Sequence, residues 1–222
     1  MIQRVYEQAC KVFNTVVVAT DDERISGAVM NFGGRAVMTS ASHKSGTDRC
    51  AEALHIAEKQ LSTTFDTVVN VQGDEPFIQP AHLKLIESCM AGDKTQIATL
   101  VKPVRDRQEL FDPNKPKVVL NINNEAIYFS RAVIPYLRGI NSLTWPDHHN
   151  YYIHIGLYAF RRDVLTAITQ LKSSPLEIAE SLEQLRWIEN GYRIKACITE
   201  FESYGIDTPE DLAKAMDKLG KI

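Results

Sequence analysis

Two periods of apolar and polar positions run along the chain and divide it into helices and short strands. Apolar residues recur three and four apart over 2–13, which predicts an amphipathic helix at the beginning of the sequence. Runs rich in valine, isoleucine and threonine predict buried strands. The predicted strands cover 15–20, 35–38, 66–71, 97–101, 117–121, 126–130, 151–160 and 192–199. The predicted helices between them cover 22–31, 47–60, 80–90, 162–171 and 175–190, and a further one begins at Thr208.

Strands that alternate with helices are typical of an α/β protein with a mostly parallel sheet and helices on both of its faces. The stretch from Pro135 to Asn150 interrupts this alternation with two prolines, two histidines, a glycine and a tryptophan. We expect it to form a long functional loop or a projecting arm. In sheets of this kind ligands bind beyond the carboxyl ends of the strands, so the polar residues at those ends are the candidates for function.

Three acidic clusters stand next to predicted strands. Asp21-Asp22 follows the first strand, as a ribose ligand or as the cap of the next helix, and the cap is favoured. Gln72-Gly73-Asp74-Glu75-Pro76 follows the strand at 66–71, and Asp207 precedes a helix start. Mg²⁺ prefers one or two carboxylates together with phosphate oxygens and water, so Asp74 and Asp207 are candidate metal ligands. An ordinary turn or a helix cap is the alternative for each.

A different polar cluster comprises His43-Lys44-Ser45-Gly46-Thr47-Asp48-Arg49. Its small hydrogen-bonding side chains and the bare backbone at Gly46 are suited to reading the edge of a nucleotide base. A capped helix entry, with Thr47 as the cap, is the alternative.

Composition and missing motifs exclude several classes of protein. The net charge is −3 without a long basic block, so charge gives no support to a nucleic-acid partner. The apolar runs are too short for a membrane span, and no signal peptide is visible. Four cysteines without metal or disulfide spacing predict reduced thiols in a cytoplasmic protein. The histidines lack zinc-site spacing, and neither a dinucleotide-binding glycine motif nor a P-loop occurs.

Six motifs, in the same order along nearly the whole chain, resemble those of the CMP-Kdo synthetases, which activate the acidic eight-carbon sugar Kdo. They are His43-Lys44-Ser45-Gly46-Thr47-Asp48-Arg49, Val71-Gln72-Gly73-Asp74-Glu75-Pro76, Tyr128-Phe129-Ser130-Arg131-Ala132-Val133-Ile134-Pro135, His154-Ile155-Gly156-Leu157-Tyr158, Leu182-Glu183-Gln184-Leu185-Arg186 and Ile206-Asp207-Thr208-Pro209-Glu210-Asp211. The resemblance implies one domain over 1–222 with a Rossmann-like nucleotidyltransferase fold and a small β-rich arm or subdomain.

The resemblance also implies an activity: CTP and Kdo give CMP-Kdo and pyrophosphate, in the cytoplasm, for lipopolysaccharide synthesis. It implies a homodimer, to whose contact the segment 135–150 contributes, and Mg²⁺ held by Asp74 and Asp207. The residues that it places at the Kdo site are Gln72, Arg131, His154, Tyr158, Glu183 and Gln184, and those on the nucleotide side are Ser45, Gly46 and Arg49.

These residue types fit that chemistry. The anomeric hydroxyl of Kdo must attack the α-phosphorus of CTP, and both molecules carry negative charge, which Mg²⁺ screens. Arg131 can hold the sugar carboxylate through its planar fork, and His154 can bind a hydroxyl. Glu183 and Gln184 can do the same. The alternatives are a core histidine at position 154 and a solvated helix face at 183–184.

The sequence departs from the family at its beginning. Family members start with a strand and a basic, glycine-containing loop that cradles the triphosphate, and this sequence starts after both. A sequence that begins late is favoured over a defective enzyme. Two other functions stay open: a related CMP-sugar-acid synthetase, such as a CMP-sialate synthetase, and an inactive fragment that binds a sugar acid. Turnover of CTP, and competition between Kdo and sialic acid, distinguish them.

Overall fold

A computed structural model describes residues 1–92 and 94–201. Contacts divide the chain into two compact units. Among the described residues, unit 1 comprises Met1–Lys84 and unit 2 comprises Leu85–Phe201. In the described part of the chain, no helix has both the length and the apolar character needed to cross a membrane.

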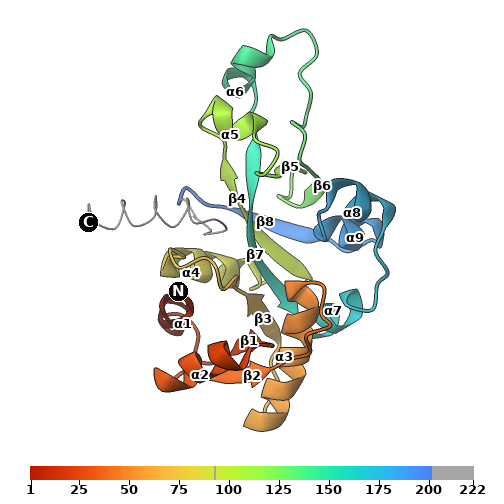
Figure 1. Cartoon of the computed structure of the whole chain (residues 1–222). Helices are drawn as coiled ribbons and strands as arrows, with labels where there is room; N and C mark the ends of the chain where they lie inside the picture. Colours follow the sequence, from red (N-terminus) through yellow and green to blue (C-terminus); the bar gives the residue numbers. More distant parts are fainter. Residues whose placement is uncertain (93, 202–222) are drawn as a thin grey trace, which may run out of the picture. The chain divides into compact units, whose positions relative to one another are not determined.

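Unit 1 alternates helices with short strands (Figure 1). Its elements are α1 (Ile2–Cys10), β1 (Val18–Thr20), α2 (Glu23–Asn31), β2 (Ala36–Met38), α3 (Gly46–Leu61), β3 (Thr67–Asn70) and the first part of α4 (Pro80–Cys89). Strands β1 and β2 pair in parallel, with Val18 opposite Ala36 and Thr20 opposite Met38. Helix α3 packs against all three strands. The carboxyl ends of β1 and β2 therefore lie at one edge, as the sequence predicts.

Side-chain caps fix where the helices of unit 1 begin. The Asp22 carboxylate accepts a hydrogen bond from the Arg24 backbone N–H at 2.8 Å, which confirms the cap interpretation of Asp22. Ser45 caps α3 by accepting from the Asp48 N–H at 3.1 Å. The predicted cap at Thr47 is wrong, because Ser45 takes that role and Thr47 is buried inside the first turn of α3.

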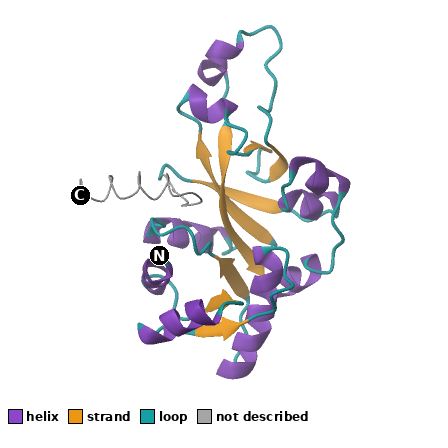
Figure 2. Ribbon diagram, viewed as in Figure 1, coloured by secondary structure: helices purple, strands orange, loops and turns teal. Residues whose placement is uncertain are grey.

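Unit 2 is built on a sheet with the strand order β6-β5-β7-β4-β8 (Figures 1 and 2). Its strands are β4 (Ile97–Pro103), β5 (Lys117–Leu120), β6 (Ala126–Ser130), β7 (Tyr152–Arg161) and β8 (Ile194–Ile198). Its helical elements, after the end of α4, are α5 (Arg107–Phe111), the 3-10 helix η1 (Ser142–Thr144), α6 (Trp145–His148), α7 (Arg162–Ile168), α8 (Pro175–Glu180) and α9 (Gln184–Glu189). The α/β class is thus confirmed.

The pairing in unit 2 differs from the mostly parallel sheet that the alternation predicts. Only β4 and β8 pair in parallel there, while β7 is antiparallel to β4 and β5, and β5 is antiparallel to β6. The residues between β5 and β6 form a tight turn closed by the Asn124 N–H to the Asn121 carbonyl. A turn this short permits only antiparallel pairing, because parallel strands need a long crossover.

Two cysteines of unit 2 meet where the end of α4 approaches β8. Cys89 and Cys197 are joined as a disulfide, with their Cα atoms 6.4 Å apart. The expectation of four reduced thiols is therefore wrong for this pair. The two residues are separated by 108 positions, so their spacing in the sequence could not reveal the contact.

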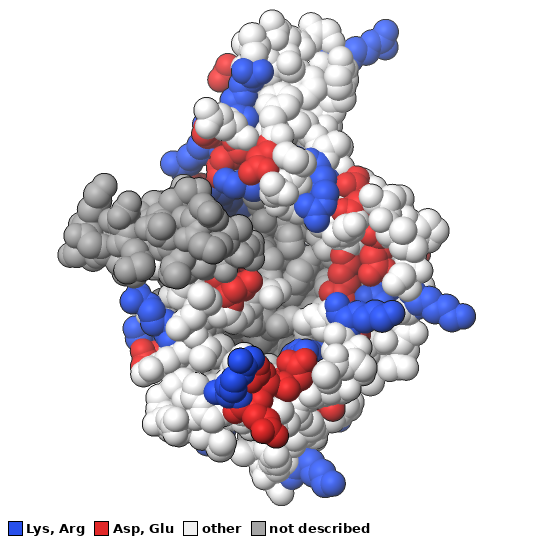
Figure 3. All heavy atoms as spheres, in the orientation of Figure 1, with Lys and Arg blue, Asp and Glu red and all other residues white. Residues whose placement is uncertain are grey.

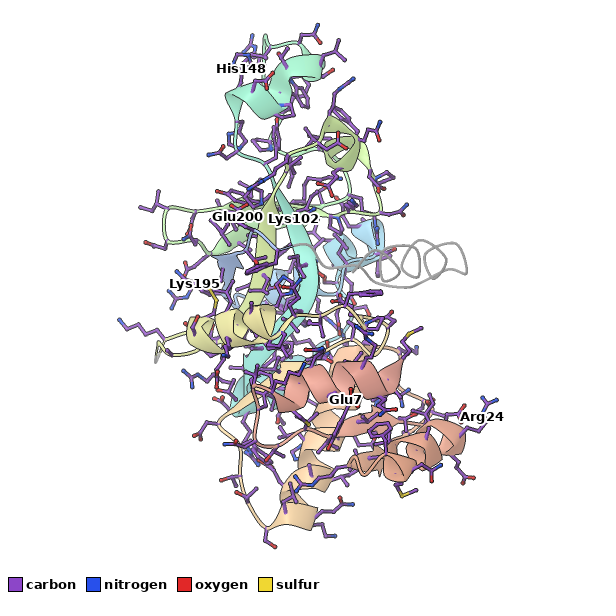
Figure 4. All side chains as sticks on the ribbon, turned by 90° about the vertical axis from the view of Figure 1, so that its left-hand side faces the viewer. Glu7, Arg24, Lys102, His148, Lys195 and Glu200 are labelled. Carbon is purple, nitrogen blue, oxygen red and sulfur yellow. A yellow bond between two sulfur atoms is a disulfide. The ribbon has the colours of Figure 1, made fainter. Side chains whose placement is uncertain are left out.

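The segment 135–150 forms an arm of unit 2. His148 lies near the end of this arm that is farthest from Lys195 of β8 (Figure 4). The arm contains η1 and α6, joined to the rest of unit 2 by irregular stretches, and it has no strand over the described residues 135–150. Trp145 of the arm belongs to a small apolar cluster with Leu110 of α5 and Tyr151. The Trp145 indole N–H donates to the Ile140 carbonyl at 3.0 Å. This cluster explains how a proline-rich segment keeps a defined shape.

Candidate active site

The strand ends of unit 1 and the beginning of α3 gather the predicted nucleotide-side residues. Ser45 caps α3, and Gly46 is its first residue. A Cβ atom at Gly46 would lie 3.7 Å from the Asn70 side-chain nitrogen, so the end of β3 lies beside the start of α3. The free N–H groups of a helix N-terminus favour negatively charged ligands such as phosphates.

Arg49 links two strand ends to α3. Its Nη1 donates to the Thr39 hydroxyl at 2.7 Å, and its Nη2 lies 3.2 Å from the Asp21 carboxylate. Asp21 follows β1 and Thr39 follows β2, so one side chain holds three elements together. The structure thus brings Ser45, Gly46 and Arg49 to one edge of unit 1. It also adds Asp21 as the partner that orients the Arg49 guanidinium.

The loop before α3 is held by Glu52. Its carboxylate accepts from the Ser40 N–H at 2.8 Å and contacts the His43 ring. The Ser40 hydrogen bond, followed by that of His43, lowers the pKa of Glu52 below its usual value. His43 is therefore held by a carboxylate of α3, which fixes the path of the loop to the Ser45 cap.

The predicted metal ligands stand in different parts of the chain. Asp74 lies in the turn after β3 and is half-buried, and Gln72 in the same turn is exposed. Asp207 lies outside the residues that the structure describes. Among the described residues no cluster of three or more metal-binding side chains exists. A single fixed carboxylate still fits Mg²⁺, because this ion takes most of its ligands from phosphates and water.

Arg131 follows β6 in unit 2 and is held by main-chain oxygens. Its Nε donates to the Glu180 carbonyl at 2.7 Å, its Nη1 to Pro113 at 3.1 Å and its Nη2 to Ser181 at 3.3 Å. A guanidinium has five N–H donors, so one hydrogen remains on each terminal nitrogen. Those two hydrogens can donate to a negatively charged ligand such as a carboxylate.

Glu180 holds the backbone at the same point. Its carboxylate accepts from the Ser130 hydroxyl at 2.6 Å and from the Arg131 N–H at 2.9 Å. Acidic side chains gather over α8 and α9 on the face shown in Figure 3. Glu180 therefore joins the end of α8 to the end of β6 and fixes the position of Arg131 between them.

His154 and Tyr158 lie side by side on β7, with ring centroids 5.2 Å apart. Burial lowers the pKa of His154 to about 3, so its ring is neutral at ordinary pH. Burial, and next the charge on Glu183, raise the pKa of Tyr158 well above its usual value, whereas the Thr99 hydroxyl lowers it in part. The buried Tyr158 hydroxyl nevertheless makes no hydrogen bond of good geometry.

The start of α9 presents the last two predicted sugar-site residues. Glu183 accepts from Arg186 at 2.8 Å, and Gln184 is buried at 5% exposure, so the alternative of a solvated helix face is wrong for Gln184. The Gln184 side-chain nitrogen and the Trp187 indole nitrogen are buried without a hydrogen-bond partner. The Trp187 ring packs on Tyr158, with centroids 5.1 Å apart, and so connects α9 with β7.

Sequence reasoning missed three residues of this region of unit 2: Thr99, Glu180 and Trp187. Thr99 had a signal, because it is the one polar residue in the apolar run from Ile97 to Val101. Glu180 and Trp187 had none, since both continue an ordinary helical pattern. The predicted sites divide between the units. Ser45, Gly46, Arg49, Gln72 and Asp74 belong to unit 1, and Arg131, His154, Tyr158, Glu183 and Gln184 belong to unit 2.

Solved structures resemble this fold. A CMP:2-keto-3-deoxy-manno-octonic acid synthetase complexed with CTP is 39% identical, with a TM-score of 0.87 over 99% of this chain and 87% of that one. A 4-diphosphocytidyl-2C-methyl-D-erythritol synthase from Anaerococcus prevotii is only 13% identical, with a TM-score of 0.59 over 99% of this chain and 89% of that one. The second likeness concerns the fold alone.

Sequence relatives carry one name. The 3-deoxy-manno-octulosonate cytidylyltransferase of Parabacteroides distasonis is 59% identical over 97% of this chain and 86% of the relative. That of Bacteroides thetaiotaomicron is 54% identical over 99% of this chain and 87% of the relative. The family model described as cytidylyltransferase matches residues 1–195. The chain therefore belongs to the cytidylyltransferase family, among the 3-deoxy-manno-octulosonate cytidylyltransferases.

Proposed function

We propose that this protein transfers CMP from CTP to Kdo. The Kdo anomeric oxygen forms a bond to the α-phosphorus, the bond from that phosphorus to the pyrophosphate oxygen breaks, and the hydroxyl proton is released. The products are CMP-Kdo and pyrophosphate. The observation that carries the proposal is the membership of the chain among the 3-deoxy-manno-octulosonate cytidylyltransferases. His154 and Tyr158, two of the residues predicted at the Kdo site, are in ring contact on β7, which supports a shared role.

The substrate acid is read by Arg131 in this proposal. Three carbonyl oxygens fix its guanidinium and leave two hydrogens for the Kdo carboxylate. An arginine that is already ordered loses little side-chain entropy when the ligand arrives, which favours affinity. Glu183 and Gln184 follow directly after the turn to which Arg131 is bound, and in this proposal they bind the sugar hydroxyls.

The nucleotide is bound by unit 1 in this proposal. Ser45, Gly46 and Arg49 stand at the beginning of α3, where N–H groups and a guanidinium suit a nucleotide. Mg²⁺ held by Asp74 and Asp207 would screen the negative charges of the two substrates and lower the pKa of the attacking hydroxyl. No protein nucleophile is required, because positioning and charge stabilisation are sufficient for such a transfer.

We also propose a homodimer in the cytoplasm, acting in lipopolysaccharide synthesis. The arm of unit 2 supports the dimer, since Tyr136 is 73% and Leu143 54% exposed on it. A hollow of 480 Å³ beside them is lined by Pro135, Pro146 and His148, among others. Exposed apolar side chains next to a hollow are typical of an interface between subunits. Light scattering of the purified protein and of Tyr136→Arg tests this.

The experiment that tests the activity is a coupled measurement of both products. The protein is incubated with CTP, MgCl₂ and Kdo, and pyrophosphate release and CMP-Kdo formation are followed by enzymatic assay and mass spectrometry. We expect equal amounts of the two products. Sialic acid is supplied in a parallel reaction and as a competitor. Preferential formation of CMP-sialate would assign a different sugar acid, and absence of any pyrophosphate release would contradict the transferase activity of this polypeptide.

A further inference from the structure

Thr99 lies next to the His154 ring, at a β-bulge between β4 and β7. Strand β4 pairs Thr99 with Tyr158 and the next residue, Leu100, with Ile155, so β7 has extra residues at this point. The Thr99 hydroxyl oxygen is 3.0 Å from His154 Nε2, 2.9 Å from the Leu157 carbonyl oxygen and 3.2 Å from the Ile155 carbonyl oxygen. Thr99 is completely buried, so these neighbours determine where its proton points.

The valence of the hydroxyl decides the direction of each bond. A threonine hydroxyl has one proton to donate, and a carbonyl oxygen can only accept. The proton is therefore directed to the Leu157 and Ile155 carbonyls, and the hydroxyl oxygen must accept from the imidazole. His154 Nε2 then carries a hydrogen. Because the ring is neutral, His154 Nδ1 carries none and is an acceptor.

We propose that Thr99 is a positioning residue that fixes His154 in the Nε2–H tautomer and thereby presents Nδ1 as an acceptor for a hydroxyl of the substrate. This inference rests on the proposed function, which places His154 in the sugar pocket. Nδ1 carries no hydrogen in this tautomer and cannot donate, so it selects a ligand that offers an O–H group. A sugar hydroxyl offers one, whereas a carboxylate or a phosphate oxygen does not.

The surroundings of the ring support a fixed orientation. Phe129 of β6 packs against His154 edge to face, with centroids 5.1 Å apart, and Tyr158 packs at 5.2 Å. These contacts and the Thr99 hydrogen bond hold the ring on three sides. His154 itself remains half-buried. Rotation of the ring by 180° would break its bond to Thr99, so tautomer and orientation are coupled.

The test is histidine NMR of the whole protein. Protein labelled with ¹⁵N-histidine gives separate signals for protonated and unprotonated ring nitrogens, and the His154 signals are those that disappear in His154→Gln. We expect protonated Nε2 and unprotonated Nδ1 in the wild type. In Thr99→Val the buried N–H loses its acceptor, so the population should shift toward the other tautomer, and the KM for Kdo should rise roughly tenfold. The KM for CTP should stay unchanged.

Two further variants separate the hydroxyl from the packing. Thr99→Ser keeps the hydroxyl and should retain the wild-type tautomer and KM for Kdo. Thr166→Val removes a hydroxyl that donates to the Arg162 carbonyl at 3.1 Å in α7, away from any histidine, and should change neither. A proton on Nδ1 in the wild-type protein would overturn the inference without any variant. An unchanged tautomer in Thr99→Val would overturn it as well.

The failure of this inference and that of the proposed function give different results. If CMP-Kdo forms but the His154 tautomer does not depend on Thr99, the positioning role alone is wrong. If the tautomer shifts in Thr99→Val while the KM for Kdo stays at the wild-type value, His154 does not bind the sugar. In that case the proposed contact between Nδ1 and a substrate hydroxyl is overturned, together with the assignment of His154 to the sugar site. The NMR result needs no substrate, so the two measurements are independent.

Discussion

We expect Arg131 to have two roles, one in substrate binding and one in folding stability. The sequence predicts it as a ligand of an acidic sugar, and the structure adds a role in holding the turn after α8, where it satisfies the Glu180 and Ser181 carbonyls. Carbonyl groups at a helix end need such partners when the helix does not continue. Removal of this arginine should therefore affect substrate binding and folding stability together.

We expect Arg131→Ala to raise the KM for Kdo about tenfold to a hundredfold and to leave that for CTP nearly unchanged, since a charge-assisted pair is lost at one substrate only. The free energy of unfolding should fall by about 1–3 kcal/mol, because carbonyl groups lose their donor. Arg131→Lys should show nearly the same KM for Kdo and the same loss of stability as Arg131→Ala, since a lysine cannot make the three hydrogen bonds at once. Steady-state kinetics and urea unfolding measure the two effects. Arg193→Ala, whose side chain is 64% exposed, is the control. A rise in the KM for CTP alone would contradict the assignment.

His154 makes the folded protein sensitive to acid. In the unfolded chain the ring takes up a proton below about pH 6.5, whereas burial lowers the pKa in the folded state to about 3. The unfolded state therefore binds more protons between these values, and stability falls as the pH falls through this range. We expect His154→Gln to reduce the loss of the urea midpoint between pH 7 and pH 5. Equal losses in both proteins would show that the ring is not buried in a neutral form.

Helices α8 and α9 show the limit of prediction at the scale of elements. The apolar pattern over 175–190 predicts one helix, but the structure breaks it after Glu180, where Ser181 has a φ of 51°. The apolar positions continue through the turn, so periodicity alone cannot reveal the break. The break places Glu183 and Gln184 at the beginning of a new helix and frees the carbonyls that Arg131 binds.

Substitutions at Ser181 test this turn. A left-handed backbone is unfavourable for β-branched residues and has no steric cost for glycine. We expect Ser181→Val to lower the free energy of unfolding by about 1–3 kcal/mol and to weaken Kdo binding, and Ser181→Gly to be neutral or stabilising by up to about 1 kcal/mol. Thermal unfolding and Kdo titration measure both. Similar stabilities for the valine and glycine variants would mean that the backbone is not left-handed at this position.

Most other helices and strands agree with the sequence prediction, because their apolar patterns are compatible with only one kind of secondary structure. The predicted strand at 97–101 is observed at Ile97–Pro103 and the one at 126–130 at Ala126–Ser130. Helix α5 was not predicted. It has only five residues, too few for a period, and depends on the Asp106 cap and on a tertiary bond from Lys102 to Glu109 at 2.8 Å. Strand pairing was predicted less well, since it depends on which segments turn back and not on their composition.

At the scale of the whole molecule, the proposed activity requires a Mg²⁺ ion, for which Asp74 and Asp207 are the candidate ligands. We expect Asp74→Asn and Asp207→Asn each to lower kcat/KM at least about a hundredfold with the fold intact, because a group that holds transition-state charge is lost. Asp66→Asn, at the other end of β3 and exposed, is the matched control. Assays over a MgCl₂ series and circular dichroism measure activity and folding. Near-wild-type rates for both variants would remove the metal assignment.

Motif residues such as His154 and Gln184 could be named from the sequence, and their role at a sugar site stays a prediction. The side chains that hold the motif residues could not be named in this way. Two of these side chains, Thr99 and Glu180, lie 55 positions from His154 and 49 from Arg131. Contacts over such separations follow from the fold.

The closeness of Cys89 and Cys197 has a consequence for protein engineering. These residues stand near the two ends of unit 2, and their Cα atoms are 6.4 Å apart, a gap that two or three residues can span. The two ends of unit 2 are therefore close enough to be joined, and a new N-terminus could be introduced at another position of the unit. A circular permutant that is joined across this gap and opened at the exposed Gly139 would keep every strand of unit 2 whole. The same geometry suits grafting of the unit into a loop of another protein whose ends are equally close.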